Sequence, residues 1–220
     1  MSRLLEFCLS FPKTLWFNIR HLPLRQAIKL PICVRYDSIV QITKGSICIE
    51  GDVQTAMIRI GFHKVPVCNY KDCTQIIIDG GKLVFQGTAH IGHGTKIHVA
   101  EGAELFLGDN FAVSASSQIN CYHKITMGRD IQFSWDCLVM DSDTHKIYGK
   151  NLEMINSDQE VKIGDKVWIG CRTTILKGCV IPDNCVIGAG SLVTGTKFTP
   201  DSIIIGSPAK SVRAIDGWEL

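Results

Sequence analysis

An aliphatic side chain recurs at every sixth position in the C-terminal part of the chain. The anchors of this series are Ile163, Ile169, Ile175, Ile181, Ile187 and Val193. Small or β-branched residues stand four places after the first five anchors, at Val167, Thr173, Cys179, Cys185 and Ser191. A helix needs a spacing near 3.6 residues, and an isolated strand alternates without a six-residue repeat. The period therefore predicts short parallel strands joined by sharp turns, in three-sided coils of about 18 residues.

The same period runs through the preceding part of the chain, with two shifts of register. Its anchors are Phe85, Ile91 and Ile97, then Leu107, Val113, Ile119 and Ile125, then Met127, Phe133 and Val139. The pattern predicts a parallel solenoid of roughly five to six coils. Cys137, Cys179 and Cys185 fall four places after an anchor, which indicates small apolar core residues.

The composition favours one soluble domain. The chain has 220 residues, of which 45% are hydrophobic, enough for one sizeable core. Its 23 basic and 21 acidic residues leave a net charge of +2 without a basic stripe, which argues against a nucleic-acid partner. The N-terminus lacks the features of a secretion signal, and no apolar run reaches transmembrane length. We therefore expect a cytoplasmic protein with its ten cysteines reduced and, without paired CxxC spacing, no metal site.

Residues 1–31 mix apolar and basic side chains and predict one or two short helices broken at Pro12, Pro23 and Pro31. Such a segment can cap the open end of a solenoid, which would otherwise expose a sheet edge. It can also make peripheral membrane contact. The apolar residues for this contact are Leu15, Trp16, Phe17 and Leu22, with Arg20, Arg25 and Lys29 nearby. The cap is the favoured interpretation. The strands that begin the stack are expected within residues 32–84.

The repeat fails between Val139 and Ile163. When the six-residue count is continued from Val139, the next three anchor positions hold polar residues: His145, Asn151 and Ser157. A loop excursion over about 146–162 is therefore predicted, and excursions of this length in compact repeats are usually functional or disordered. His145 stands at the root of this loop, preceded by Asp141 and Asp143. The residues alone support equally a general base with an orienting carboxylate and a turn with polar side chains.

The runs "IGDKVWIGCRTTILKGCVIPDNCVIGAGSLVT" and "GSPAKSVR" resemble the hexapeptide-repeat acyltransferases. Within that family they are most similar to the galactoside and maltose O-acetyltransferase type and to acetyltransferases of polysaccharide biosynthesis. The resemblance covers residues 85–213 and implies an all-β fold, a left-handed parallel β-helix over residues 32–213. A cap (1–31) precedes the β-helix and a tail (214–220) follows it. The left hand comes from the resemblance alone, because parallel crossovers are generally right-handed.

The resemblance also implies an acetyl-CoA-dependent O-acetyltransferase that acts on a sugar hydroxyl of a cell-surface polysaccharide precursor. Transfer would be direct, with His145 as general base and Asp141 or Asp143 orienting it. The residues implied at the acetyl-CoA site are Gly170, Cys171, Ala189, Ser191, Thr194, Lys197, Lys210 and Arg213. The acceptor is expected to be a small-molecule or lipid-linked saccharide. Of the two predicted substrate-binding residues, Tyr148 would stack on a sugar face and Trp168 would lie at the corner beside the acyl group. Family members assemble as homotrimers with active sites between subunits, and we expect the same here.

Several alternatives remain. An amino sugar or a streptogramin-type antibiotic could accept the acetyl group through the same base. In another class, γ-type carbonic anhydrases use a similar β-helix with three histidine ligands to one metal, and His90, His93, His98 and His123 lie in the repeat. The excursion loop and the "GSPAK" ending favour the acetyltransferase. A third possibility is a scaffold of the same fold that lacks catalysis.

Overall fold

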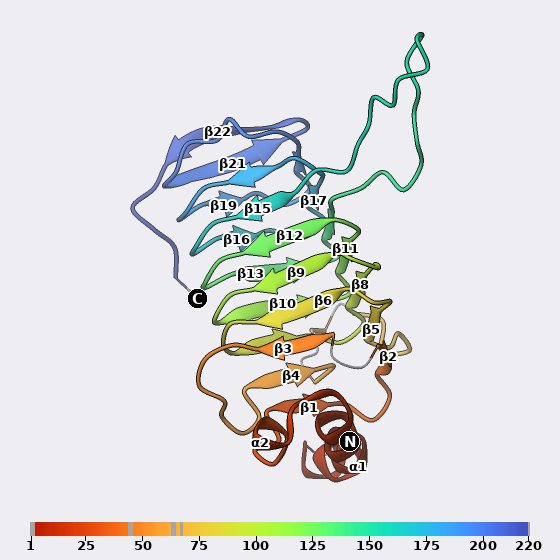
Figure 1. The fold of residues 1–220 in the computed structure, drawn as a ribbon. Coiled ribbons are helices and arrows are strands. Elements are labelled where there is room, and N and C mark those ends of the chain that lie inside the picture. The colour runs from red at the N-terminus through yellow and green to blue at the C-terminus, as the bar shows by residue number, and fades with distance from the viewer. Residues whose placement is uncertain (1–2, 44–45, 63–64, 67, 220) are drawn as a thin grey trace.

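The computed structural model describes residues 3–43, 46–62, 65–66 and 68–219 (Figure 1). Two helices, α1 (Arg3–His21) and α2 (Leu24–Ala27), lie at one end of a stack of short strands. The strands form three sheets, and successive strands of the chain pass from one sheet to the next.

Sheet A has nine strands: β1 (Ile32–Val34), β4 (Ile58–Ile60), β7 (Ala89–Ile91), β10 (Phe111–Ala115), β13 (Gln132–Trp135), β16 (Trp168–Ile169), β19 (Val186–Ile187), β21 (Ser202–Gly206) and β22 (Ala209–Ala214). Sheet B has seven: β2 (Ile39–Ile42), β5 (Gln75–Ile78), β8 (Lys96–Val99), β11 (Gln118–Cys121), β14 (Leu138–Met140), β17 (Thr174–Ile175) and β20 (Leu192–Val193). Sheet C has six: β3 (Ile47–Ile49), β6 (Lys82–Phe85), β9 (Glu104–Leu107), β12 (Lys124–Met127), β15 (Val161–Ile163) and β18 (Val180–Ile181).

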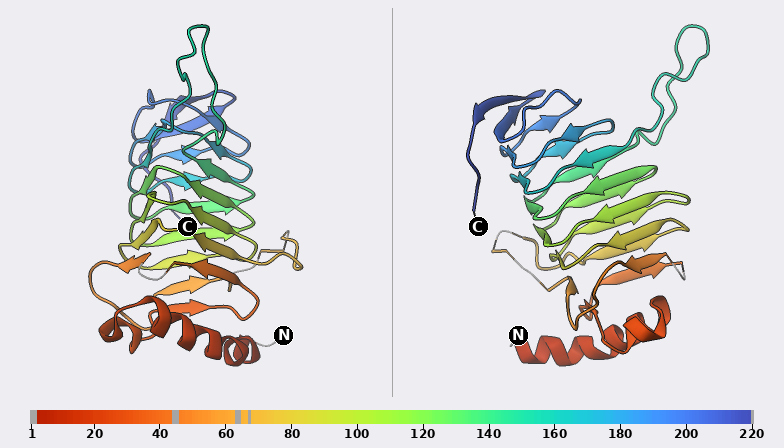
Figure 2. Two further views of the ribbon diagram at one scale, coloured as in Figure 1. Left: turned by 45° about the vertical axis from the view of Figure 1, so that its right-hand side comes forward. Right: turned by 60° about the vertical axis from the view of Figure 1, so that its left-hand side comes forward.

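Each coil of the chain contributes one strand to each sheet, so the described part of the molecule is a three-sided prism (Figure 2). Neighbouring strands pair in parallel, except that β22 folds back antiparallel on β21 and ends the stack. Six complete coils agree with the predicted five to six. The left-handed parallel β-helix predicted from the sequence is confirmed.

The predicted anchors form the core of the prism. Every anchor from Phe85 to Val193 is at most 3% exposed, and the three cysteines placed four positions after an anchor are at most 2% exposed. Strand pairing explains the period, because Ile175 lies opposite Val139 on one side and Val193 on the other. Coils in register thus stack equivalent side chains inside the prism, where apolar burial stabilises the fold.

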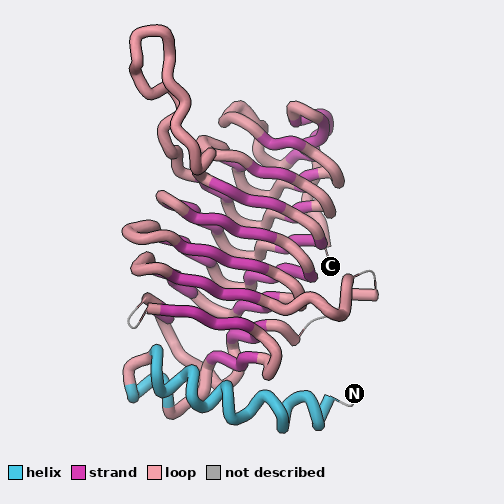
Figure 3. The backbone as a smooth tube through the Cα atoms, turned by 90° about the vertical axis from the view of Figure 1, so that its right-hand side faces the viewer, coloured by secondary structure: helices cyan, strands magenta, loops and turns pink. Residues whose placement is uncertain are grey.

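Helix α1 lies across the end of the prism and covers the edge of sheet A (Figure 3). The expectation that Pro12 breaks this segment is wrong, because α1 runs through Pro12 without interruption. A proline inside a helix costs one hydrogen bond and about 3 kcal/mol, which packing of the helix against β1 offsets. Among the described residues, no helix is both long enough and apolar enough to span a bilayer.

Polar side chains of α1 take the place of a further strand along β1. The Asn18 amide accepts the N–H of Ile32 at 3.1 Å and donates to its carbonyl at 2.7 Å. Four residues rise about 6 Å along a helix, close to the rise of two residues along a strand, so a helix spacing of four matches alternate strand residues. The three pairs are Asn18 with Ile32, Thr14 with Val34, and Ser10 with Tyr36. The unpaired edge groups that a first strand would expose are thereby satisfied.

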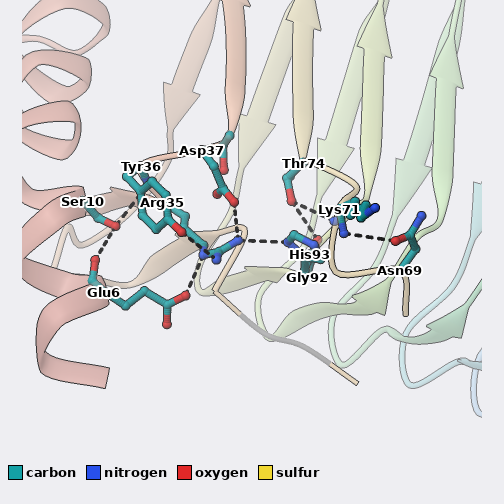
Figure 4. Close-up of polar contacts among 12 residues, drawn as sticks. Glu6, Ser10, Arg35, Tyr36, Asp37, Asn69, Lys71, Thr74, Gly92 and His93 are labelled. Carbon is teal, nitrogen blue, oxygen red and sulfur yellow. Dashed lines mark hydrogen bonds and ion pairs between the residues drawn. The ribbon is translucent and has the colours of Figure 1, made fainter. Parts of the chain in front are cut away.

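A buried arginine ties α1 to the prism (Figure 4). The Arg35 side chain is only 3% exposed and donates to the carboxylates of Glu6 in α1 at 2.6 Å and Asp37 at 2.7 Å. Its guanidinium also lies 3.1 Å from Nδ1 of His93, two coils further along the stack. A buried cation needs this pairing, because desolvation without a partner is costly.

Candidate functional site

The excursion loop leaves the prism after β14 and returns at β15, so Val161 and Lys162, placed in the predicted loop, belong to a strand (Figure 1). His145 lies at the root of this loop and is exposed. Its Nδ1 lies 3.0 Å from the hydroxyl of Thr144. With Nδ1 engaged in this way, Nε2 is the ring nitrogen left for proton transfer.

Asp141 performs a structural task instead of orienting the histidine. It is completely buried and accepts the backbone N–H groups of Tyr122 at 2.7 Å and His123 at 2.9 Å, one coil earlier. Burial and this carboxylate raise the pKa of the neighbouring Cys121 thiol far above its ordinary value. The expectation that Asp141 holds the His145 ring is therefore corrected.

Asp143 is linked to the backbone of His145 through Asn156, and it does not contact the imidazole ring of His145. Its carboxylate accepts hydrogen bonds from Lys177 at 2.6 Å and Asn156 at 2.9 Å, and these, Lys177 foremost, lower its pKa. The same Asn156 amide donates to the carbonyl of His145 at 2.7 Å, and Lys177 donates to the Asn156 carbonyl. Within the described residues, neither predicted aspartate contacts the imidazole. Asp143, Asn156 and Lys177 form a network that we call the loop brace.

The sequence did not reveal Asn156 or Lys177 as members of the site. Asn156 lies inside the segment where the repeat has failed, and Lys177 occupies a turn between two regular strands. Neither position has a spacing that distinguishes it from solvent-exposed turn residues. Tyr148 lies further out in the loop, 56% exposed, where it forms a β-bridge with Met154.

The predicted donor residues begin at the corner between sheets A and B. The N–H of Gly170 donates to Ile187 at 2.8 Å, and the carbonyl of Cys171 accepts the N–H of Gly190 at 2.9 Å. A Cβ at Gly170 would lie 2.7 Å from the backbone nitrogen of Ala189, so only glycine permits this close stacking. Gly170, Cys171 and Ala189 therefore line one edge, which we call the A/B edge.

Three other predicted donor residues do not contribute exposed side chains to the A/B edge. Ser191 is buried, and its hydroxyl donates to the Gly188 carbonyl at 2.6 Å, so this side chain closes the corner and does not face a ligand. Thr194 and Lys197 follow β20 and lie beyond the opposite end of sheet B. The structure therefore separates Thr194 and Lys197 from the A/B edge, whereas Ser191 lies at that corner with its side chain turned inward.

The two basic residues of the terminal strand differ in their distance from the A/B edge. Lys210 pairs with Ile205 in β21, which itself contacts the corner glycine Gly188. Arg213 pairs with Ile203, further from that corner. Both side chains are exposed, and Lys210 is the nearer cation.

Trp168 stands on the outer face of sheet A, two residues before Gly170. It is 42% exposed, and its indole N–H donates to Ser134 at 3.3 Å. Its ring packs at 6.3 Å from that of Trp218. The structure therefore places it near the A/B edge and away from the excursion loop.

His145 and the A/B edge lie at opposite ends of sheet B. Val139 of β14 lies opposite Ile175 of β17 in a parallel pair. His145 comes six residues after Val139, whereas Cys171 comes four residues before Ile175. A single chain therefore does not bring the histidine to Cys171.

The histidines that suggested a hydratase have other surroundings. His93 lies against the Arg35 guanidinium, a poor setting for a cation ligand. His98 lies 3.4 Å from Asp79 and packs on Tyr122. Among the residues that the structure describes, no group of three or more His, Cys, Asp or Glu side chains is arranged to hold a metal ion.

Comparison with known proteins agrees with this architecture. Residues 160–195 match the family model of the bacterial transferase hexapeptide (six repeats). The chain is 33% identical over 128 residues to a probable acetyltransferase of Mycobacterium tuberculosis, covering 56% of this chain and 41% of that protein. It is 30% identical over 122 residues to the galactoside O-acetyltransferase of Escherichia coli, covering 54% and 59%. The chain thus spans about half the length of these relatives.

Among solved structures, a polysialic acid O-acetyltransferase has the same fold. It aligns with a TM-score of 0.58 at 22% identity, covering 84% of this chain and 88% of that one. The resemblance of the chain to the hexapeptide-repeat acyltransferases is therefore confirmed by its repeat, its fold and its sequence.

Proposed function

We propose that this protein is an acetyl-CoA-dependent O-acetyltransferase that acts on a sugar hydroxyl of a cell-surface polysaccharide precursor. The observation that carries the proposal is the exposed histidine at the root of the excursion loop, where the loop brace fixes its backbone. The names of the galactoside and polysialic acid O-acetyltransferases support a saccharide acceptor.

The chemistry requires a base near the acceptor. A sugar hydroxyl is a weak nucleophile until its proton is removed as the new bond to the acyl carbon forms. The Nε2 of His145 takes this proton and then delivers it to the leaving thiolate of coenzyme A. No acyl-enzyme is required, and Cys171 is not a nucleophile in this scheme.

The backbone at the A/B edge suits the thioester. The N–H groups of Gly170 and Arg172 donate to carbonyls of adjacent coils, at 2.8 and 3.0 Å. The N–H of Cys171, between them, donates to no acceptor among the described residues. We assign this N–H to the thioester oxygen, where a fixed donor stabilises the negative charge of the transition state.

A second copy of the chain completes the site. Because His145 and Cys171 lie at opposite ends of sheet B, the base of one subunit would act on the thioester held by its neighbour. A homotrimer with sites between subunits fulfils this requirement.

The test of the base is the variant His145→Ala. We expect acetyl transfer to fall by at least about a hundredfold while acetyl-CoA binding is retained, because a general base typically contributes this much to the rate. Thiol release is measured across sugars, amino sugars, nucleotide sugars and lipid-linked saccharides, and binding by calorimetry. The matched control is His98→Ala, in β8, two coils before the strand that leads into Asp143, and in no proposed role. An unchanged turnover number for His145→Ala would exclude this mechanism.

The donor assignment is tested separately with Lys210→Ala and Arg213→Ala. Both cations would meet nucleotide phosphates of the donor, and the nearer Lys210 is expected to contribute more. We expect the dissociation constant of acetyl-CoA to rise about tenfold for Lys210→Ala and less for Arg213→Ala. Unaltered affinity in the double variant would remove both residues from the site.

A further inference from the structure

The exposed face of α1 has the opposite polarity from an ordinary surface helix. A surface helix normally buries its apolar stripe and presents polar residues to water. Here the buried face carries Ser10, Thr14 and Asn18, because these side chains hydrogen bond to the edge of β1. Phe17 and Leu22, expected from the sequence to take part in a membrane contact, are buried and do not. The exposed side chains of residues 5–21 are Leu5, Phe7, Cys8, Leu9, Phe11, Pro12, Leu15, Trp16, Ile19 and Arg20.

Exposed apolar side chains also follow on α2 and at its C-terminal end. Trp16 is 53% exposed, Ile19 60%, and Leu24 and Ile28 72% each. Both helices lie at the same end of the prism, and α1 runs across that end (Figures 2 and 3). The exposed side chains of both helices therefore belong to that end of the molecule. A hollow on this surface is lined by Pro12, Leu15, Trp16, Ile19 and Arg20. We call this surface, with Leu24 and Ile28, the cap face.

The cap segment also carries a concentrated positive charge. Residues 1–31 contain five basic residues and one acidic residue, although the whole chain has a net charge of only +2. The single acid, Glu6, is neutralised by its ion pair with Arg35. Lys13 and Lys29 donate to the backbone carbonyls of Tyr36 and Val53, whereas Arg20, which lines the hollow, and Arg25 are exposed. An apolar, aromatic surface with exposed cations matches a bilayer with anionic head groups.

We infer that the cap face docks the protein onto an anionic lipid surface, with the β-helix axis standing away from the membrane. The aromatic and aliphatic side chains enter the interfacial region, while Arg20 and Arg25 meet lipid phosphates. In the proposed trimer, three such faces lie at the same end, and simultaneous engagement strengthens binding without new contacts.

If the protein has the proposed function, this orientation sets how far the acceptor hydroxyl must lie from the membrane. Four strand spacings separate β1, beside the cap, from β13 in the coil that carries His145. At about 4.8 Å per spacing, the base stands roughly 20 Å above the cap. A lipid-linked acceptor would therefore have to present its hydroxyl on an extended saccharide and not next to the lipid.

Vesicle flotation of the full chain tests the inference. We expect the wild-type protein to bind vesicles of phosphatidylcholine with phosphatidylglycerol, more strongly than phosphatidylcholine alone, and added salt to weaken binding. The variant Ile19→Gln, Leu24→Gln, Ile28→Gln should lose at least about tenfold in vesicle affinity. Arg20→Gln with Arg25→Gln should lose roughly tenfold for the anionic vesicles only. Leu152→Gln, which changes an equally apolar residue of the excursion loop that is 82% exposed, should bind as the wild type does.

Three outcomes would overturn the inference. The first is that the wild type fails to float with anionic vesicles. The second is that the triple variant floats as well as the wild type. The third is that the wild type has twice the mass of the triple variant in solution, which would show that a second copy of the protein covers the cap face. Thermal unfolding of the variants confirms that they are folded. Transfer to a water-soluble sugar is measured in parallel, so that a failure of the proposed activity is distinguished from a failure of membrane docking.

Discussion

Asp141 lies in a sequence context that suggests catalysis, but its carboxylate binds backbone N–H groups. Its buried carboxylate accepts two N–H groups of the preceding coil, at 2.7 and 2.9 Å. Hydrogen bonds to a buried charge contribute more than neutral ones, and removal of the acceptor leaves the donors unsatisfied.

We predict that Asp141→Ala lowers the free energy of unfolding by about 2–4 kcal/mol, because two buried donors lose their acceptor. Urea denaturation measures the loss. The pH profile of any remaining transfer should stay that of the wild type, since the carboxylate does not contact the imidazole. A displaced pH profile with normal stability would instead support the catalytic role.

Lys177 is predicted to position His145 without contacting the substrate. The variant Lys177→Gln removes the cation that holds Asp143 and the Asn156 carbonyl. We expect kcat/KM to fall roughly tenfold through loss of orientation, with acetyl-CoA affinity unchanged. Faster amide hydrogen exchange over residues 146–156 should accompany this loss. The exposed Lys146→Gln, outside the loop brace, is the matched control.

The loop brace should also loosen in acid. The pKa of Asp143 is lowered in the folded protein by Lys177 and Asn156, so its stabilising effect is complete above the unfolded-state pKa of about 4. This effect is lost as the pH falls from there through the lower folded-state pKa. The ratio of the observed amide exchange rate in the loop to the intrinsic rate at the same pH should therefore rise below about pH 4 in the wild type. In Asp143→Asn this additional rise should be absent, and an identical rise in both proteins would contradict the assignment.

At the scale of elements, the sequence predicts the strands and core positions that repeat from coil to coil, but it does not predict contacts that occur only once in the molecule. The anchors could be identified because each coil places equivalent side chains in the same interior position. The role of Asp141 could not, because its partners lie one coil earlier in a segment with no distinguishing spacing. Pro12 misled the prediction because tertiary packing of α1 outweighs a local cost.

The cap element gives a prediction of its own. Asn18→Ala leaves the N–H and carbonyl of Ile32 without partners at a buried edge. We expect the free energy of unfolding to fall by about 2–3 kcal/mol. Ile19→Ala, the next residue on the exposed side of α1, should change it by less than about 0.5 kcal/mol. Urea denaturation measures the free energy of unfolding of both variants. Equal losses would show that the hydrogen bonds of Asn18 to Ile32 contribute no specific stability.

At the scale of the whole molecule, the separation of His145 from the A/B edge predicts complementation between two inactive variants. His145→Ala lacks the base but keeps the donor edge. Ala189→Arg places a bulky side chain on the exposed donor edge and keeps the base. If each site takes its base from one subunit and its donor from the next, randomly mixed trimers recover about a quarter of wild-type activity.

This recovery distinguishes the two arrangements of the site. Sites contained within one chain would remain inactive in every mixture, because each chain carries one defect. The two variants are unfolded and refolded together at equal concentration, and the same variants refolded separately and then combined are the control. Activity that appears only after joint refolding requires subunits to share a site. In the proposed trimer, the base at the root of the excursion loop would act on a thioester held by another copy.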